Sequence, residues 1–149
     1  MKTYADTSVL FSLYATDANS IRADAWRQAN PAPLPFTTFH RLELRNALSL
    51  AMFQQRLTQQ EVQAAWQEVE NDCAAGLLAA RGGLWHRVLV EAQTYALNHT
   101  PAAGCRTLDV LHVATAKLLG VSDFCAFDTR QSTLAGKVGL AAVSPAKPQ

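Results

Sequence analysis

The sequence is poor in cysteine and has no motif built from it. Its three cysteines lie far apart, at Cys73, Cys105 and Cys125, and none belongs to a CxxC pair or to a His and Cys spacing typical of zinc sites. An odd number of widely spaced cysteines also argues against a disulfide scaffold. We therefore expect a cytoplasmic protein that depends on neither zinc–thiolate nor disulfide chemistry.

Long apolar runs and an excess of one charge are also absent. No segment approaches the roughly 20 apolar residues of a membrane-spanning helix. Asp6 interrupts the N-terminal stretch where a signal peptide would carry its apolar run. The 13 Lys and Arg residues and 12 Asp and Glu residues leave a net charge of +1. This balance excludes a polybasic nucleic-acid arm and an acidic tail, although a local basic groove stays possible.

The apolar content of the chain is sufficient for one folded domain. The chain has 149 residues, 49% of them hydrophobic, and this length leaves no room for a second domain. We expect a single domain over residues 1–144 and a C-terminal tail over 145–149. Short apolar strands alternate with helices, which predicts an α/β fold in three layers, with helices on both faces of a central parallel sheet.

The predicted elements follow from apolar periodicity and from capping and turn residues. Strands are predicted at residues 3–5, 34–37, 77–80, 124–127 and 140–143. Helices are predicted at 9–15, 19–29, 38–55, 58–74, 84–98 and 107–120, and a short one follows residue 128. Residues 99–105, which include Pro101, are predicted to form a loop.

The predicted helix at residues 107–120 is apolar on nearly all sides, which indicates a buried helix. Thr107 is predicted to cap its start and Gly120 to close its end. Asp109 falls in the first turn, where a buried carboxylate needs a partner. The partial positive charge of the helix N-terminus or Arg106 could supply that partner locally.

Three further acids are placed in a way that suggests a shared site. Asp6 follows the first strand and Asp128 follows the strand at 124–127, so both belong at the carboxyl edge of a parallel sheet, where ligands bind. Asp109 can reach the same edge, although its placement there is not required. Glu43 lies about one turn into its helix, beside apolar residues. The other acids of the helical region lie on polar faces or at caps.

Each acid also has a local explanation. Asp6 and Asp109 could cap helices, Asp128 could be a turn residue, and Glu43 could pair with Arg41 or Arg45 on a helix surface. These explanations do not account for four acids at one edge, where their charges would repel. A divalent cation would relieve that repulsion, and all-oxygen ligation suits Mg²⁺ or Mn²⁺.

At these residues the chain resembles the PIN-domain ribonucleases, and in particular the VapC-like toxins of type II toxin–antitoxin pairs. The resemblance covers essentially the whole chain and depends on the order of its motifs more than on any one of them. The matching motifs are Asp6-Thr7-Ser8-Val9-Leu10, Glu43-Leu44-Arg45-Asn46-Ala47-Leu48, residues 108–116 around Asp109, and Phe127-Asp128-Thr129-Arg130-Gln131 with Leu134-Ala135.

The resemblance implies an endoribonuclease that depends on Mg²⁺ or Mn²⁺ and hydrolyses RNA with a metal-activated water. Asp6, Glu43, Asp109 and Asp128 fall on the family's acidic positions. We assign Asp6 and Asp109 as main ligands, with Glu43 and Asp128 in support. Thr7 or Ser8 resembles the hydroxyl residue beside the first acid. Arg106 and Arg130 are candidates for holding RNA phosphates, and a buried, hydrogen-bonded role is expected for His112.

The same likeness implies a cognate antitoxin protein and a homodimer. Two apolar surfaces are candidates for binding the antitoxin or a second copy of the chain. One is formed by the early helices, which carry Leu10, Leu13, Ile21 and Trp26, and the other by the helix that carries Trp66.

Two other functions stay open. A haloacid-dehalogenase-like phosphatase would use Asp6 as its nucleophile, but Ser8 stands where that chemistry needs a second acid, and Lys117 lies in mid-helix. A non-catalytic module could use the acids to bind a structural ion or a basic peptide.

Overall fold

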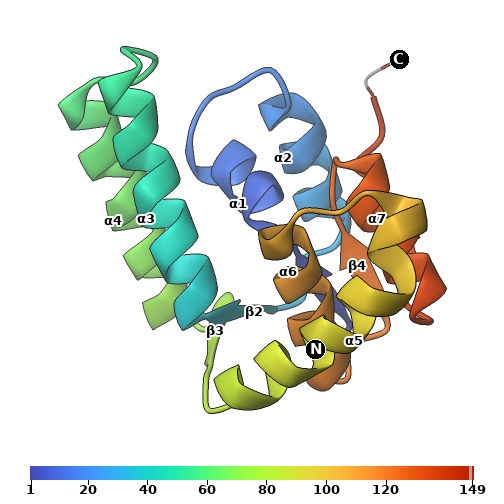
Figure 1. The fold of residues 1–149 in the computed structure, drawn as a ribbon. Helices are drawn as coiled ribbons and strands as arrows, with labels where there is room; N and C mark the ends of the chain where they lie inside the picture. The colour runs from blue at the N-terminus through green and yellow to red at the C-terminus, as the bar shows by residue number, and fades with distance from the viewer. Residues whose placement is uncertain (148) are drawn as a thin grey trace. The chain divides into compact units, whose positions relative to one another are not determined.

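The computed structural model describes residues 1–147 and 149, and it contains two units (Figure 1). Unit 1 consists of Met1–Asp6 and Gly82–Ser144, and unit 2 consists of Thr7–Arg81 and Pro145–Gln149. Each unit combines helices with parallel strands, so the α/β class predicted from the sequence is confirmed. The predicted domain boundary at residue 144 stays a prediction.

Unit 1 is built on a three-stranded parallel sheet of order β1-β4-β5. The ring of Tyr4 in β1 stacks on that of Phe124 in β4, with centroids 5.6 Å apart, and both side chains are buried. Helix α5 packs on α6 and α7. The elements are β1 (Thr3–Ala5), α5 (Trp85–Ala103), α6 (Thr107–Leu118), β4 (Asp123–Cys125), α7 (Thr129–Lys137) and β5 (Ala141–Val143).

Unit 2 has a two-stranded parallel sheet formed by β2 and β3. Helix α1 packs against the other three helices of the unit, and α3 and α4 lie side by side (Figure 1). The core includes Leu44 and Leu48 of α3 and Val69 of α4. The elements are α1 (Thr7–Tyr14), α2 (Ser20–Ala29), β2 (Leu34–Thr37), α3 (Thr38–Phe53), α4 (Gln59–Ala74) and β3 (Leu78–Arg81).

Local capping chemistry sets the starts of the two longest helices of unit 2. The Thr58 hydroxyl accepts from the Glu61 backbone N–H at 3.2 Å, and the Glu61 carboxylate accepts from the Thr58 N–H at 2.6 Å. This is the capping box that the sequence predicts at the start of α4. Thr37 and His40 form the corresponding pair at the start of α3.

The loop predicted at residues 99–105 is wrong, because α5 continues through Pro101 to Ala103. Proline lacks a backbone N–H, so it removes one hydrogen bond from a helix. Here Pro101 lies in the last turn, and α5 packs along α6. Gly104 closes the helix in a left-handed conformation, φ +67°, with its N–H bonded to the Thr100 carbonyl at 2.8 Å.

Two further boundaries differ from the prediction. Thr107 is the first residue of α6 rather than its cap, because Arg106 holds the cap position. Strand β4 ends at Cys125, two residues before the predicted end, and Asp128 is the N-cap of α7 rather than a turn residue. In addition, Leu108 is 51% exposed, so the first turn of α6 is open on one side.

The three cysteines are free thiols, and burial raises the pKa of each, to about 12 for Cys125 in β4. Among residues 1–147 and 149, no helix combines the length and apolar character that a bilayer crossing requires.

The early-helix faces proposed as partner surfaces are largely internal. Leu10 is fully buried and Trp26 is 8% exposed, whereas Ile21 is 72% exposed. Leu10 and Trp26 thus belong to the core of unit 2, and their apolar spacing does not indicate a partner surface.

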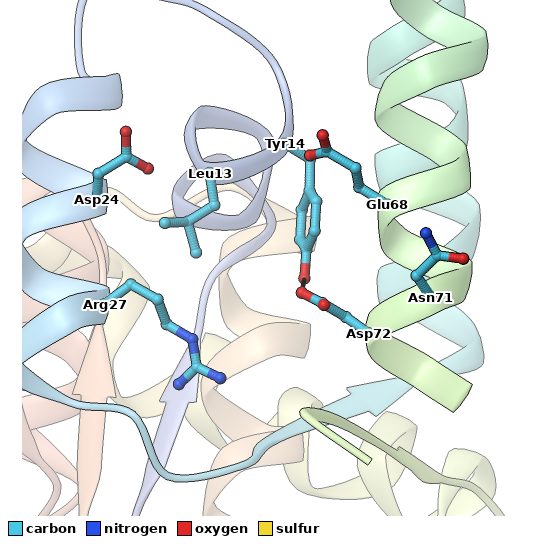
Figure 2. Close-up of a pocket in the computed structure, with 7 residues that line it drawn as sticks. All are labelled: Leu13, Tyr14, Asp24, Arg27, Glu68, Asn71 and Asp72. Atoms are coloured by element: carbon cyan, nitrogen blue, oxygen red, sulfur yellow. Dashed lines mark hydrogen bonds between the residues drawn. The ribbon is translucent and has the colours of Figure 1, made fainter. Parts of the chain in front are cut away.

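Unit 2 encloses a polar pocket of about 280 Å³ between α1, α2 and α4 (Figure 2). Asp24 and Arg27 reach it from α2, and Glu68 and Asp72 from α4. The Tyr14 hydroxyl donates to Asp72 Oδ2 at 2.6 Å, a contact that joins α1 to α4. Burial and the Asp72 carboxylate together raise the pKa of Tyr14 well above its usual range. Asp72 is thus a structural partner rather than a solvated residue of a polar face.

Replacing Thr58 by alanine removes one half of the α4 capping box. We expect Thr58→Ala to lower the free energy of unfolding by about 1 kcal/mol, because an N-terminal amide loses its acceptor. Urea denaturation followed by circular dichroism measures this change. Thr94→Ala, at an exposed position within α5, is the matched control. Equal stability of the two variants would contradict the assigned role.

Replacing Tyr14 by phenylalanine removes the bond between α1 and α4. We expect Tyr14→Phe to destabilise the protein by about 1 kcal/mol, since Asp72 is only partly buried and water can solvate it. Asp72→Asn keeps an acceptor oxygen and should cost less. Urea denaturation of the two variants tests this order, and a reversed order would refute it.

Candidate metal centre

Asp6 lies at the carboxyl edge of the unit 1 sheet because the strand pairing continues past β1. Its backbone N–H donates to the Cys125 carbonyl at 2.9 Å, one step beyond the last paired residues of β1 and β4. The residue is only 9% exposed. The sequence-based placement of Asp6 directly after the first strand is therefore correct.

Asp109 lies in the first turn of α6 and is half-buried. Burial raises the pKa of its carboxyl, and the N–H of Arg106, which donates to Asp109 Oδ2 at 3.1 Å, opposes that rise. The negative charges of Asp128 and Asp6 raise this pKa further. The local capping role suggested by the sequence is thus real, and so is the repulsion from the two other acids.

Asp128 caps α7 with one oxygen of its carboxyl. Oδ1 accepts from the backbone N–H groups of Arg130 at 2.8 Å and Gln131 at 3.1 Å. A carboxylate at a helix N-terminus is stabilised by the amides and by the helix dipole. In both Asp109 and Asp128, the second carboxyl oxygen lies outside the cap.

Gln131 in α7 was not among the residues predicted for the site, yet it contacts all three acids. It is 1% exposed, and its Nε2 donates to Asp6 Oδ1 at 3.0 Å and approaches the Asp109 carbonyl at 3.5 Å. Its backbone N–H binds Asp128. The sequence carries a weak signal for it, since Asp128-Thr129-Arg130-Gln131 has the spacing of a capping box.

His112 occupies the buried position expected for it. It is 2% exposed, its Nδ1 lies 2.7 Å from the Tyr4 hydroxyl, and its Nε2 lies 3.5 Å from Asp6 Oδ1. With its single proton on Nε2, a neutral ring accepts from Tyr4 and presents an N–H to Asp6. Asp6 Oδ1 therefore has two nitrogen neighbours, His112 Nε2 and Gln131 Nε2.

Glu43 belongs to unit 2, where it is half-buried in α3. The Thr7 hydroxyl donates to Glu43 Oε1 at 2.8 Å. Thr7 is buried and directly follows Asp6 in the chain. Arg41, one of the two arginines suggested as partners of Glu43, pairs instead with Glu70, and the guanidinium of Arg45 lies over the Trp66 ring.

The remaining predicted site residues lie at helix starts. Arg106 and Arg130 are exposed in unit 1, at the N-cap of α6 and in the first turn of α7. Ser8 is exposed in the first turn of α1 in unit 2, and its carbonyl accepts from Ser12 Oγ at 3.2 Å.

The chemical type of the oxygen atoms in unit 1 decides which cation the acids could bind. Within residues 1–147 and 149, no three or more His, Cys, Asp or Glu side chains form a group that could hold a metal as they stand. However, Asp6, Asp109 and Asp128 supply only carboxylate oxygens, the ligand type of Mg²⁺ and Mn²⁺. Their charges act on one another. Gln131 Oε1 adds a buried oxygen with no hydrogen-bond partner. The donor type of these residues therefore suits a hard cation.

Comparisons with known proteins agree with this architecture. The family model described as the PIN domain matches residues 3–137. Among solved structures, the chain is similar to the crystal structure of FitAcB from Neisseria gonorrhoeae, at 20% sequence identity and a TM-score of 0.64. That match covers 96% of this chain and 97% of the other. No curated protein matches the sequence.

The FitAcB likeness shows the fold, and the family model, which spans most of the sequence, shows the family. This chain belongs to the PIN domain family, whose members are typically metal-dependent nucleases.

Proposed function

We propose that this protein is a divalent-metal-dependent endoribonuclease, and that it is the toxin of a toxin–antitoxin pair. The observation that carries the proposal is the gathering of Asp6, Asp109 and Asp128 in unit 1, where Gln131 contacts all three. Burial raises the pKa of Asp109, and the charges of Asp128 and Asp6 raise it further. Such crowding is unfavourable in the protein alone and becomes favourable when a cation neutralises it.

Asp6 and Asp109 are the proposed main ligands, and Asp128 supports them through the carboxyl oxygen that the α7 cap does not use. Glu43 is proposed as a fourth, supporting acid because Thr7, the residue after Asp6, donates to it. When bound, Mg²⁺ or Mn²⁺ would supply positive charge for the phosphodiester and lower the pKa of a water molecule. The chain's own contribution is to hold the carboxylates in place through the cap bonds of Asp109 and Asp128 and the bond from Gln131 to Asp6.

RNA binding is assigned to the helix starts. Arg106 and Arg130 are exposed cations close in sequence to Asp109 and Asp128, which suits contacts with phosphates. The hydroxyls of Thr7 and Ser8 are proposed substrate contacts. A cognate antitoxin, a homodimer and a cytoplasmic location follow from the resemblance to VapC-like toxins and are part of the proposal.

A non-catalytic module that binds an ion or a peptide is the second candidate. The cap bonds of Asp109 and Asp128 favour it, because a purely structural role also predicts them. The phosphatase alternative does not survive the assignment to the PIN domain family.

Asp6→Asn and Asp109→Asn test the proposal directly. We expect each to reduce Mn²⁺-dependent cleavage of a single-stranded RNA by about 10²–10³-fold, the effect typical of losing one group that stabilises transition-state charge. Excess EDTA should abolish cleavage by the wild type. The assay is gel electrophoresis of end-labelled RNA.

Asp123→Asn is the matched control, because Asp123 lies in β4 and pairs with Lys2 at 3.3 Å. It should retain wild-type activity. Activity that resists EDTA, or that persists in both site variants, would favour the non-catalytic module.

Arg106→Ala and Arg130→Ala test the assignment of RNA contacts. On single-stranded RNA, each lost phosphate contact should reduce the slope of log K against log salt concentration by about 0.7 and weaken binding regardless of sequence. Fluorescence anisotropy at several salt concentrations, with a catalytically inactive Asp6→Asn background, measures both. Arg87→Ala, exposed in α5, serves as control, and equal slopes in all three would refute the assignment.

A further inference from the structure

One buried side chain of α7 joins the three acids of unit 1. Gln131 donates through Nε2 to the Asp6 carboxylate, the same nitrogen approaches the Asp109 carbonyl, and its backbone N–H is held by Asp128. These contacts span β1, α6 and α7, and the two residues of the first contact lie 125 positions apart in the chain. Gln131 thereby ties together the starts of two helices and the end of a strand.

The orientation of the Gln131 amide follows from its neighbours. Nε2 faces two acceptors, the Asp6 carboxylate and the Asp109 carbonyl, so the flipped amide would place its oxygen against two other oxygens. In the observed orientation Oε1 is buried and has no partner among the described residues. A buried polar atom without a partner is unfavourable for stability, and it requires an explanation beyond packing.

Two nitrogen atoms lie close to one oxygen of the Asp6 carboxyl. Oδ1 receives Gln131 Nε2 at 3.0 Å and has His112 Nε2 at 3.5 Å. The hydrogen bond from Gln131 restricts rotation of the Asp6 carboxyl. In metal sites, hydrogen bonds to a ligating carboxylate set its orientation in this way.

We propose that Gln131 is a positioning residue of the metal centre. Its amide nitrogen holds the Asp6 carboxylate through the bond to Oδ1, and its buried Oε1 would accept a hydrogen bond from a water of the hydrated cation. Mg²⁺ keeps several of its waters when it binds to proteins, which provides such a donor. This inference rests on the proposed function, because it concerns the same site.

Gln131→Met tests the role, since methionine fills similar volume without an amide. We expect the variant to bind Mn²⁺ about 10–100-fold more weakly, the usual effect of removing a group that orients a metal ligand. Isothermal titration of the purified protein with MnCl₂ measures this affinity without RNA. In the cleavage assay, the Mn²⁺ concentration for half-maximal rate should rise by the same factor, and saturating Mn²⁺ should restore most of the rate.

Gln131→Asn is the second variant, for use if methionine prevents folding, because it keeps the amide and withdraws it by one methylene. Gln63→Met, exposed in α4, is the matched control and should bind Mn²⁺ as the wild type does. Circular dichroism and thermal unfolding confirm that each variant is folded. A structural role alone would lower stability and leave the affinity for Mn²⁺ unchanged.

The outcomes separate this inference from the proposal on which it rests. If the wild type binds Mn²⁺, Asp6→Asn does not, and the folded Gln131 variants bind with wild-type affinity, the role of Gln131 is refuted alone. If the wild type neither binds Mn²⁺ nor cleaves RNA, the proposed function fails, and the role of Gln131 fails with it.

Discussion

The parallel pairing of β1 with β4 is the constraint on which the acidic centre of unit 1 depends. The pairing runs one residue beyond the strand, through the bond from the Asp6 amide to the Cys125 carbonyl. It brings a carboxylate to a buried place at the sheet edge, where water alone cannot compensate its charge. The contacts of His112 and Gln131 with Asp6 meet that need within the protein.

Helix N-termini provide the other two carboxylates. Asp109 and Asp128 each accept hydrogen bonds from backbone amides through one carboxyl oxygen, at the starts of α6 and α7. At Asp109, burial and neighbouring negative charge raise the pKa of the carboxyl, and the hydrogen bond from the Arg106 amide opposes that rise. A capping acid with a second oxygen outside the cap is thus already ordered before any ligand arrives. Preorganisation of this kind is what a binding site requires.

The features that were predictable from the sequence depend on residues that are close to one another in the chain. The alternation of short apolar runs with helices indicates the parallel α/β class, and Thr58 and Glu61 predict the start of α4 because both partners lie within one turn. The position of Asp6 directly after a strand was also predictable, because residues 3–5 and Asp6 are adjacent in the chain. By contrast, Gln131 meets Asp6 across 125 residues, and no local pattern reports that contact.

The errors in the prediction have the same origin. Pro101 reads as a helix breaker, but the packing of α5 on α6 outweighs one lost hydrogen bond. The apolar residues of the early helices looked available to a partner, although the core of unit 2 buries Leu10 and Trp26. The side chains of 107–120 looked enclosed on every side, yet Leu108 faces solvent. In each case tertiary contacts, which local propensity does not describe, decided the outcome.

The aromatic stack of Tyr4 on Phe124 connects the acidic residues of unit 1 to its hydrophobic core. Tyr4 is at once a packing partner of Phe124 and, through its hydroxyl, a neighbour of the imidazole beside Asp6. A substitution at Phe124 that loosens the stack would therefore disturb the alignment of a carboxylate that it never touches.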